Sequence, residues 1–326
     1  MTDHPSAAAG PFRRADRSPI DPAKFRDPSV TAKGERRAVA PMTGLTTLWF
    51  NTGTLCNLAC ATCYIESSPR NDALVYLTAA EVAAYLDEVA AERLPVCEIG
   101  FTGGEPFMNR DTVAMLTDVL ERGYDALVLT NAMRPMRRFE RGLAALRARH
   151  GDRLMIRVSL DHHSRAVHEA ERGPGTWDKA VDGLRWLASE GFRLAVAGRA
   201  LPDEAEVDAR IAYARLFADL MLPIDAADPS RLVLFPEMDV AADVAEISDG
   251  CWSILNLSPA SVMCASSRMV VKRRGASRPG VVACTLLPYD PGFDMGSTLV
   301  AAMRPVALNH PHCARFCVLG GASCSG

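Results

Sequence analysis

Apolar, strand-like segments alternate with helical patterns between residues 45 and 236, and this alternation constrains the fold more than any other feature. The strand-like segments are rich in β-branched and aromatic residues. Thr78 and Glu81 form a capping box at the start of the first helical pattern. Such alternation is typical of a parallel sheet with right-handed crossovers. The expected strands are residues 45–50, 96–101, 126–130, 154–160, 193–198 and 231–236, and later helices are expected at 110–122, 138–149, 176–190 and 204–220.

The alternation stops near residue 240, where glycine, proline and cysteine become frequent. We therefore predict an α/β fold: a partial (β/α)6 TIM-like barrel over residues 43–240 and a small cysteine-rich C-terminal domain over 241–326. Residues 1–42 lack periodicity and are expected to form a flexible N-terminal extension. The active site of such a barrel lies at the C-terminal ends of its strands.

The overall composition favours a globular enzyme or binding protein. The chain has 326 residues and a net charge of −3, from 36 basic and 39 acidic residues, so a dominant nucleic-acid or anionic-membrane surface is not expected. No apolar run approaches the roughly 20 residues of a membrane-spanning helix. The N-terminus lacks a secretory signal pattern, which predicts a cytoplasmic location. The 10 cysteines are then better explained as metal ligands or reactive thiols than as disulfides.

Three cysteines, Cys56, Cys60 and Cys63, follow the first expected strand directly. A cubane iron–sulfur cluster normally takes one thiolate per iron, so three cysteines leave one iron open to another ligand. A zinc ion that takes its fourth ligand from elsewhere in the chain is the alternative. Cys97, in the second expected strand, is predicted to be a small buried hydrophobic residue.

The motif Cys56-Asn57-Leu58-Ala59-Cys60-Ala61-Thr62-Cys63, followed by the aromatic Tyr64, resembles the CxxxCxxC loop of the radical S-adenosylmethionine (SAM) superfamily. The "GGEP" that closes the next strand resembles a second motif of that family. The resemblance implies a SAM-binding 4Fe–4S cluster held by the three cysteines. It also implies reductive cleavage of SAM to a 5′-deoxyadenosyl radical that abstracts hydrogen from a substrate.

The resemblance also implies which residues contact SAM. The Gly103-Gly104 backbone and Glu105 are expected at the methionyl ammonium group, and Ser159 and Arg199 at later strand ends are expected near the methionyl carboxylate or the ribose. Together with the aromatic residue after the cysteine motif, these are the expected cofactor-binding residues. The sequence assigns no catalytic residue for the step on the substrate.

The C-terminal cysteines resemble those of a twitch or SPASM auxiliary domain, and their number fits one auxiliary 4Fe–4S cluster better than two. Zinc is an alternative here too, because His310 and His312 flank one of these cysteines. Cys251 fits the ligand pattern less well. The expected ligands come from Cys264, Cys284, Cys313, Cys317 and Cys324.

The leading hypothesis is therefore a radical SAM enzyme acting on an unknown small-molecule or peptide substrate. Its expected partners are that substrate and a one-electron donor such as flavodoxin or ferredoxin, with neither nucleic acid nor membrane. A non-catalytic iron–sulfur, zinc-binding or electron-transfer protein is the alternative.

Overall fold

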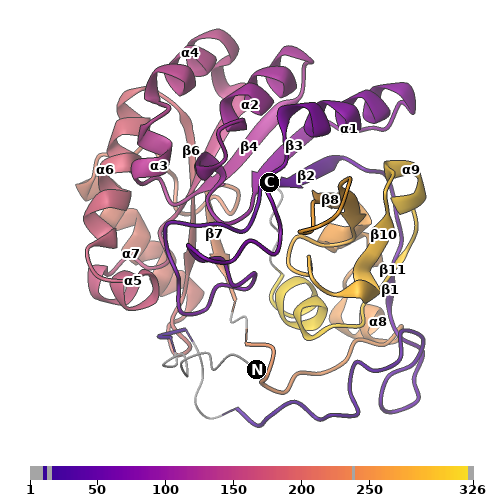
Figure 1. Ribbon diagram of the computed structural model, residues 1–326. Coiled ribbons are helices and arrows are strands. Elements are labelled where there is room, and N and C mark those ends of the chain that lie inside the picture. The colour runs from indigo at the N-terminus through magenta and orange to yellow at the C-terminus, as the bar shows by residue number, and fades with distance from the viewer. Residues whose placement is uncertain (1–9, 13–16, 237–238, 322–326) are drawn as a thin grey trace.

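The computed structural model describes residues 10–12, 17–236 and 239–321. Within them, one sheet of nine strands has the order β10-β9-β8-β2-β3-β4-β5-β6-β7 (Figure 1). Neighbouring strands from β2 to β7 are parallel, as expected for a partial barrel. These strands are β2 (Thr47–Asn51), β3 (Glu98–Thr102), β4 (Asp125–Thr130), β5 (Leu154–Ser159), β6 (Arg193–Arg199) and β7 (Leu232–Phe235), which correspond to the predicted ones.

Helices connect successive strands and cover the outer side of the sheet (Figure 1). The predicted capping box is confirmed. The Thr78 side chain accepts a hydrogen bond from the backbone N–H of Glu81, and the Glu81 side chain accepts one from the backbone N–H of Thr78. None of the helices in the described part of the chain is long and apolar enough to cross a membrane. The helices are α1 (Ala79–Ala91), α2 (Thr112–Glu121), α3 (Arg134–Arg137), α4 (Glu140–His150), α5 (Arg165–Arg172), α6 (Thr176–Ser189) and α7 (Glu206–Asp219).

The parallel register brings the C-terminal strand ends together at one rim. Asn51 at the end of β2 lies opposite Thr102 of β3, and Ser159 at the end of β5 lies opposite Ala197 of β6. The loops that carry the cysteine motif and the other predicted site residues therefore start from the same edge of the sheet, where barrel active sites form.

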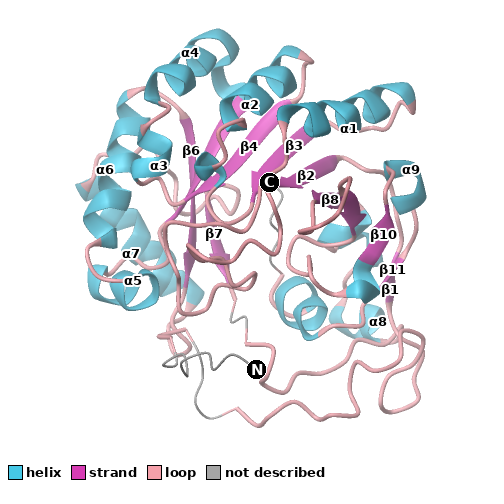
Figure 2. Ribbon diagram, viewed as in Figure 1, coloured by secondary structure: helices cyan, strands magenta, loops and turns pink. Residues whose placement is uncertain are grey.

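The C-terminal region extends the same sheet. Strand β8 (Ser267–Val271) pairs in parallel with β2, and β9 (Gly280–Val282) and β10 (Asp294–Gly296) follow as antiparallel strands. The rest of this region consists mainly of loops and short helices, including α8 (Cys251–Leu255) and α9 (Leu299–Ala302) (Figure 2). Sheet pairing therefore joins this cysteine-rich region directly to the barrel.

The expected flexible extension is wrong for residues 17–42, which pack against the C-terminal region. Arg37 forms a buried ion pair with Glu246 at 2.6 Å, and their side chains are 0% and 5% exposed. The same carboxylate accepts from the backbone N–H groups of Phe25 and Ala32. Strand β1 (Val39–Ala40) pairs with β11 (Val306–Ala307). Polar contacts hold this segment, so it needs no apolar periodicity; residues 1–9 and 13–16 lie outside the described part.

Cys97 also differs from its prediction, because it is exposed. Strand β3 begins one residue later, at Glu98, so Cys97 precedes the strand and does not point into the core. Its sulfur lies 3.5 Å from the carbonyl oxygen of Thr46.

Candidate cofactor site and auxiliary cysteine site

Cys56, Cys60 and Cys63 line one cavity at the C-terminal rim, here called the cofactor cavity. They lie in the loop between β2 and α1. The sulfur of Cys56 accepts from the backbone N–H of Leu58 at 3.4 Å, and that of Cys63 accepts from Ser67 at 3.3 Å. Donors aimed at sulfur favour the thiolate form, which is the form that binds metal.

Burial opposes thiolate formation in the absence of a cation. Burial raises the pKa of Cys56 to about 12 and that of Cys60 to about 11, although the nearby Arg172 guanidinium lowers the latter pKa. Thiolates at these positions therefore need a bound positive charge. An iron cluster supplies it, and metal binding would release the thiol protons.

The two glycines of the GGEP motif bring the end of β3 against the cysteine loop. The backbone N–H of Gly104 donates to the carbonyl of Gly53 at 2.8 Å. A Cβ on Gly103, whose φ is +143°, would lie 2.5 Å from that same oxygen, and one on Gly104 would lie 2.3 Å from the carbonyl oxygen of Leu55. Both glycines line the cavity, and chain packing beside Cys56 is sufficient to require them.

Glu105 lies behind the cavity wall instead of among its lining residues. Its carboxylate accepts from the Thr130 hydroxyl at 2.8 Å and from the Asn131 backbone N–H at 2.8 Å, and it also caps the turn at Phe107. Burial raises its pKa to about 7. In this structure Glu105 joins the ends of β3 and β4, and a contact with the methionyl ammonium group stays a prediction.

Tyr64, Ser159 and Arg199 line the cofactor cavity, as the prediction requires. The Arg199 guanidinium donates to the Thr62 hydroxyl and stacks 5.2 Å from the ring centre of Phe12. Among the described residues, Arg199 Nε and Ser67 Oγ are buried and have no hydrogen-bond partner. Such groups are expected to meet a polar ligand. Three cysteines together with these two groups fit a cluster with a bound polar molecule.

Helix α5 contributes two residues that the sequence argument did not assign. Glu171 accepts from the Thr62 backbone at 2.8 Å and hydroxyl at 2.7 Å, so it fixes the cysteine loop. Arg172 lines the cavity and pairs with Asp161 at 2.7 and 3.0 Å. The sequence signal for this ion pair was the position of Arg172, eleven residues after Asp161, which lies at a strand end.

We expect Arg172→Met to destabilise the protein by about 3–5 kcal/mol, because it leaves the Asp161 carboxylate buried without its ion-pair partner. The side chains of this pair are 12% and 6% exposed. Urea denaturation of the anaerobically purified variant should show a lower midpoint with an unchanged slope.

Arg165→Met is the matched control, because Arg165 lies on the same helix and pairs with Asp178. Those side chains are 54% and 66% exposed. Solvent screens such a pair, so the control should keep the midpoint of the unsubstituted protein. Equal shifts in both variants would contradict a special role for the buried pair.

Four of the described cysteines line a second cavity, here called the auxiliary cavity. Cys264 precedes β8, Cys284 follows β9, and Cys313 and Cys317 lie in the short helical segment Cys313–Val318. Burial raises the pKa of Cys264 to about 11 and that of Cys284 well above its usual value. Four thiols match the ligand count of one cubane.

A cluster and a single zinc ion need different sulfur spacings. Zinc bonded to sulfur at about 2.3 Å in a tetrahedron holds its sulfurs about 4 Å apart. Among the described residues, the potential ligand atoms of His162, His163 and Glu204 all lie within 4.8 Å of one another. The buried Arg268 guanidinium, which donates to the Cys264 carbonyl at 2.6 Å, also places positive charge beside the thiols.

The remaining ligand candidates differ in whether they line the auxiliary cavity. His312 lines the auxiliary cavity, whereas His310 does not. Cys251 starts α8, where its sulfur accepts from the Ser248 backbone N–H at 3.4 Å and does not line the cavity. Cys324 lies outside the described residues, so its expected role stays a prediction.

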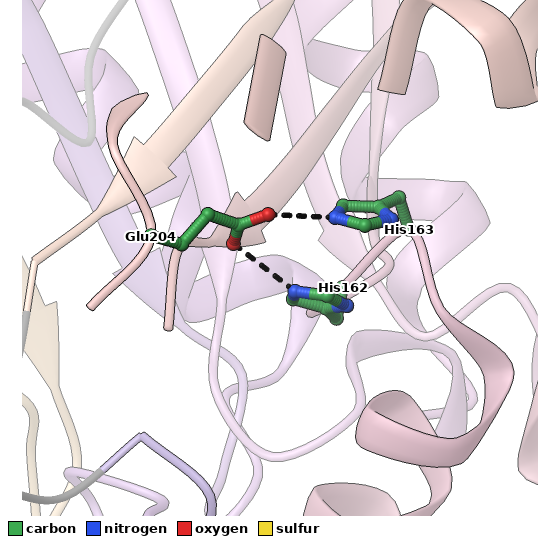
Figure 3. A group of neighbouring side chains, drawn as sticks. All are labelled: His162, His163 and Glu204. Atoms are coloured by element: carbon green, nitrogen blue, oxygen red, sulfur yellow. Dashed lines mark hydrogen bonds and ion pairs between the residues drawn. The ribbon is translucent and has the colours of Figure 1, made fainter. Parts of the chain in front are cut away.

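His162, His163 and Glu204 form a hydrogen-bonded clamp between the loops after β5 and β6 (Figure 3). The two Nε2 atoms lie 3.1 and 2.8 Å from the Glu204 oxygens. The Ser164 backbone N–H donates to His162 Nδ1 at 3.0 Å, so the proton of neutral His162 must be on Nε2. A metal would need the lone pair of that nitrogen. This arrangement therefore fits a loop clamp better than a metal site.

Comparison with known proteins agrees with this geometry. Residues 50–209 match the radical SAM superfamily. This segment carries the cysteine loop and most of the barrel, so it is a radical SAM domain, and members of that superfamily use a 4Fe–4S cluster and SAM.

Two similar relatives are mycofactocin maturase MftC of Mycobacterium tuberculosis (strain CDC 1551 / Oshkosh) and AlbA of Bacillus subtilis (strain 168), a biosynthesis protein of the antilisterial bacteriocin subtilosin. MftC is 31% identical over 42% of this chain and 33% of its own, and AlbA is 31% identical over 44% and 30%. The chain thus spans about a third of the length of these curated relatives.

Streptococcus suis SuiB, solved with its precursor peptide SuiA, has the same fold. The two structures align with a TM-score of 0.58 and 12% sequence identity, and the alignment covers 80% of this chain and 65% of the SuiB chain. This similarity extends beyond the matched family segment and supports the observed barrel architecture.

Proposed function

We propose that this protein is a radical SAM enzyme that modifies a peptide. The observation that carries the proposal is the convergence of Cys56, Cys60 and Cys63 with two buried, unpartnered polar groups in one cavity. The proposed ligands of the SAM-binding cluster are these three cysteines. When bound, the cluster supplies the electron that cleaves SAM and gives a 5′-deoxyadenosyl radical.

The residues around the cysteines bind and orient SAM in this proposal. Arg199 pairs with the methionyl carboxylate, and Ser67 and Ser159 supply hydroxyl groups to polar atoms of SAM. Glu105 holds the ends of β3 and β4 in place through Thr130 and Asn131. Apolar side chains that line the same cavity exclude water, which protects a reactive intermediate from side reactions.

We further propose that Cys264, Cys284, Cys313 and Cys317 bind one auxiliary 4Fe–4S cluster. Its support is the four-thiol cavity. Leu286 lines both cavities, so the auxiliary site adjoins the space in which the substrate would react. An auxiliary cluster there has a position suited to electron transfer or substrate binding.

A peptide substrate is supported by the relatives. One is a maturase, a second takes part in bacteriocin biosynthesis, and the fold neighbour SuiB binds a precursor peptide. The expected electron donor, flavodoxin or ferredoxin, stays a prediction.

We expect the anaerobically reconstituted protein to form 5′-deoxyadenosine from SAM when dithionite is the reductant. Chromatography with mass detection measures the product, and the unreduced holoprotein is the control. A loaded, reducible cluster that yields no 5′-deoxyadenosine would favour the alternative, a non-catalytic electron-transfer protein.

A further inference from the structure

We propose that the cofactor cavity receives an uncharged apolar side chain of the substrate, either aromatic or branched aliphatic. This inference rests on the proposed function and specifies the chemistry of the residue that reacts. It follows from the mixture of polar and apolar residues that line one cavity. The cysteines and polar strand ends supply the polar part of the lining, and five apolar residues, here called the apolar wall, supply the apolar part.

The apolar wall consists of Ile65, Leu129, Phe235, Leu286 and Phe316. Ile65 follows the cysteine motif, Leu129 and Phe235 lie near the ends of β4 and β7, and the last two come from the auxiliary region. The rings of Phe235 and Phe316 lie 5.4 Å apart between centroids. A wall of this kind stabilises a ligand by excluding water from apolar surface, and aromatic rings add preferred stacking geometries.

Each charged side chain among the described residues of the cavity lining already has a partner or an assigned ligand. Its charged lining residues among those described are Asp161, Arg172 and Arg199, apart from the cysteine thiols. Asp161 and Arg172 neutralise each other at 2.7 Å. Arg199 is assigned to the carboxylate of SAM. A lysine or glutamate side chain, or the phosphates of a nucleoside triphosphate, would therefore enter without a counter-ion, and burying an unpaired charge is strongly unfavourable.

The position of Phe316 links substrate binding to the auxiliary site. It lies between Cys313 and Cys317 in sequence and is 1% exposed, yet its side chain lines the cofactor cavity. Phe235 contacts it from the barrel. The two rings thus form the part of the wall where the barrel and the auxiliary region meet, and a side chain held there lies in the same cavity as the three cysteines.

Binding is the first test, using holoprotein with SAM and without reductant. The probes are capped tripeptides Ac-Ala-X-Ala-NH2, with X as Tyr, Phe, Leu, Val, Lys or Glu, together with GTP, each titrated by calorimetry. The apolar peptides should bind at least about tenfold more tightly than the Lys and Glu peptides or GTP. Equal affinities, no binding by any peptide, or a preference for the charged probes would overturn the inference.

Deuterium transfer is the second test, with dithionite and side-chain-deuterated peptides. Abstraction breaks a C–D bond of the side chain and forms a C–D bond at the 5′ carbon, so 5′-deoxyadenosine gains one deuterium. The label should come from the apolar peptides and not from the Lys or Glu peptides. Unlabelled 5′-deoxyadenosine with every peptide would overturn the substrate inference alone, whereas complete absence of 5′-deoxyadenosine would mean that the proposed function fails.

Two variants locate the binding wall. Phe235→Ala and Phe316→Ala should each weaken apolar-peptide binding about tenfold. Phe235 is outside the cysteine-rich segment, so its variant should keep the full iron content. Leu319→Ala is the control, since Leu319 follows Phe316 closely and is 51% exposed. Unchanged binding in Phe235→Ala, or an equal loss in Leu319→Ala, would contradict the assigned wall.

Discussion

Cys60→Ala is expected to reduce 5′-deoxyadenosine formation to the level of a reaction without enzyme. Cys60 is one of three cysteines around the cofactor cavity, and the two thiolates that remain are too few to hold a cubane. The variant should lose about four irons per chain and keep about four in the auxiliary site. Iron and sulfide analysis, alongside the product assay, measures both effects.

Cys97→Ala is the matched control for this experiment. Cys97 is exposed and lies outside both cysteine cavities, so its removal should change neither the iron content nor product formation. If Cys60→Ala lost all its iron, the two metal sites would depend on each other. Strand β8 pairs with β2 directly before the cysteine loop, which is the structural route for such dependence.

The barrel could be predicted from the sequence because each of its strands and predicted helices is encoded by a short, continuous stretch of residues. Each strand is a short run of apolar residues, and each predicted helix has a period that differs from that of a strand. The capping box at Thr78 and Glu81 fixed a helix start to the residue. The cysteine spacing likewise predicted a site from neighbouring positions, since all three expected ligands belong to one loop.

The contacts that depend on distant parts of the chain could not be predicted. Glu171 reaches the cysteine loop at Thr62, more than one hundred positions earlier in the chain. Arg37 pairs with Glu246, 209 positions later in the chain, so a segment without periodicity is held in place. The contacts of Glu105 with Thr130 and Asn131, at the end of another strand, could not be predicted for the same reason. Polar pairing of this kind leaves no periodic pattern.

The candidate ligands of the auxiliary site show both what the sequence predicts and what it leaves open. The sequence offered five cysteines and two histidines without a means of choosing among them. Folding brings Cys264, Cys284, Cys313 and Cys317 around one cavity and leaves Cys251 at the start of α8. The choice depends on how β8, β9 and the last helical segment meet, which is a property of tertiary packing.

Cys284→Ala is expected to remove about four irons per chain from the auxiliary site while the cofactor site keeps its cluster. Cys284 is buried after β9, and its loss leaves three thiols among the described residues that line the auxiliary cavity. Electron paramagnetic resonance of the reduced variant should lose one of two cluster signals. Formation of 5′-deoxyadenosine without a peptide should persist, because that reaction needs the three cysteines of the other cavity.

Cys251→Ala separates ligand loss from a general effect of removing a cysteine in this region. Its sulfur accepts a hydrogen bond from the Ser248 backbone N–H and does not line the auxiliary cavity, so the variant should keep the full iron content and both signals. Zinc analysis of the unsubstituted protein completes the test. About one zinc and four irons per chain would mean that the auxiliary site holds zinc instead of a second cluster.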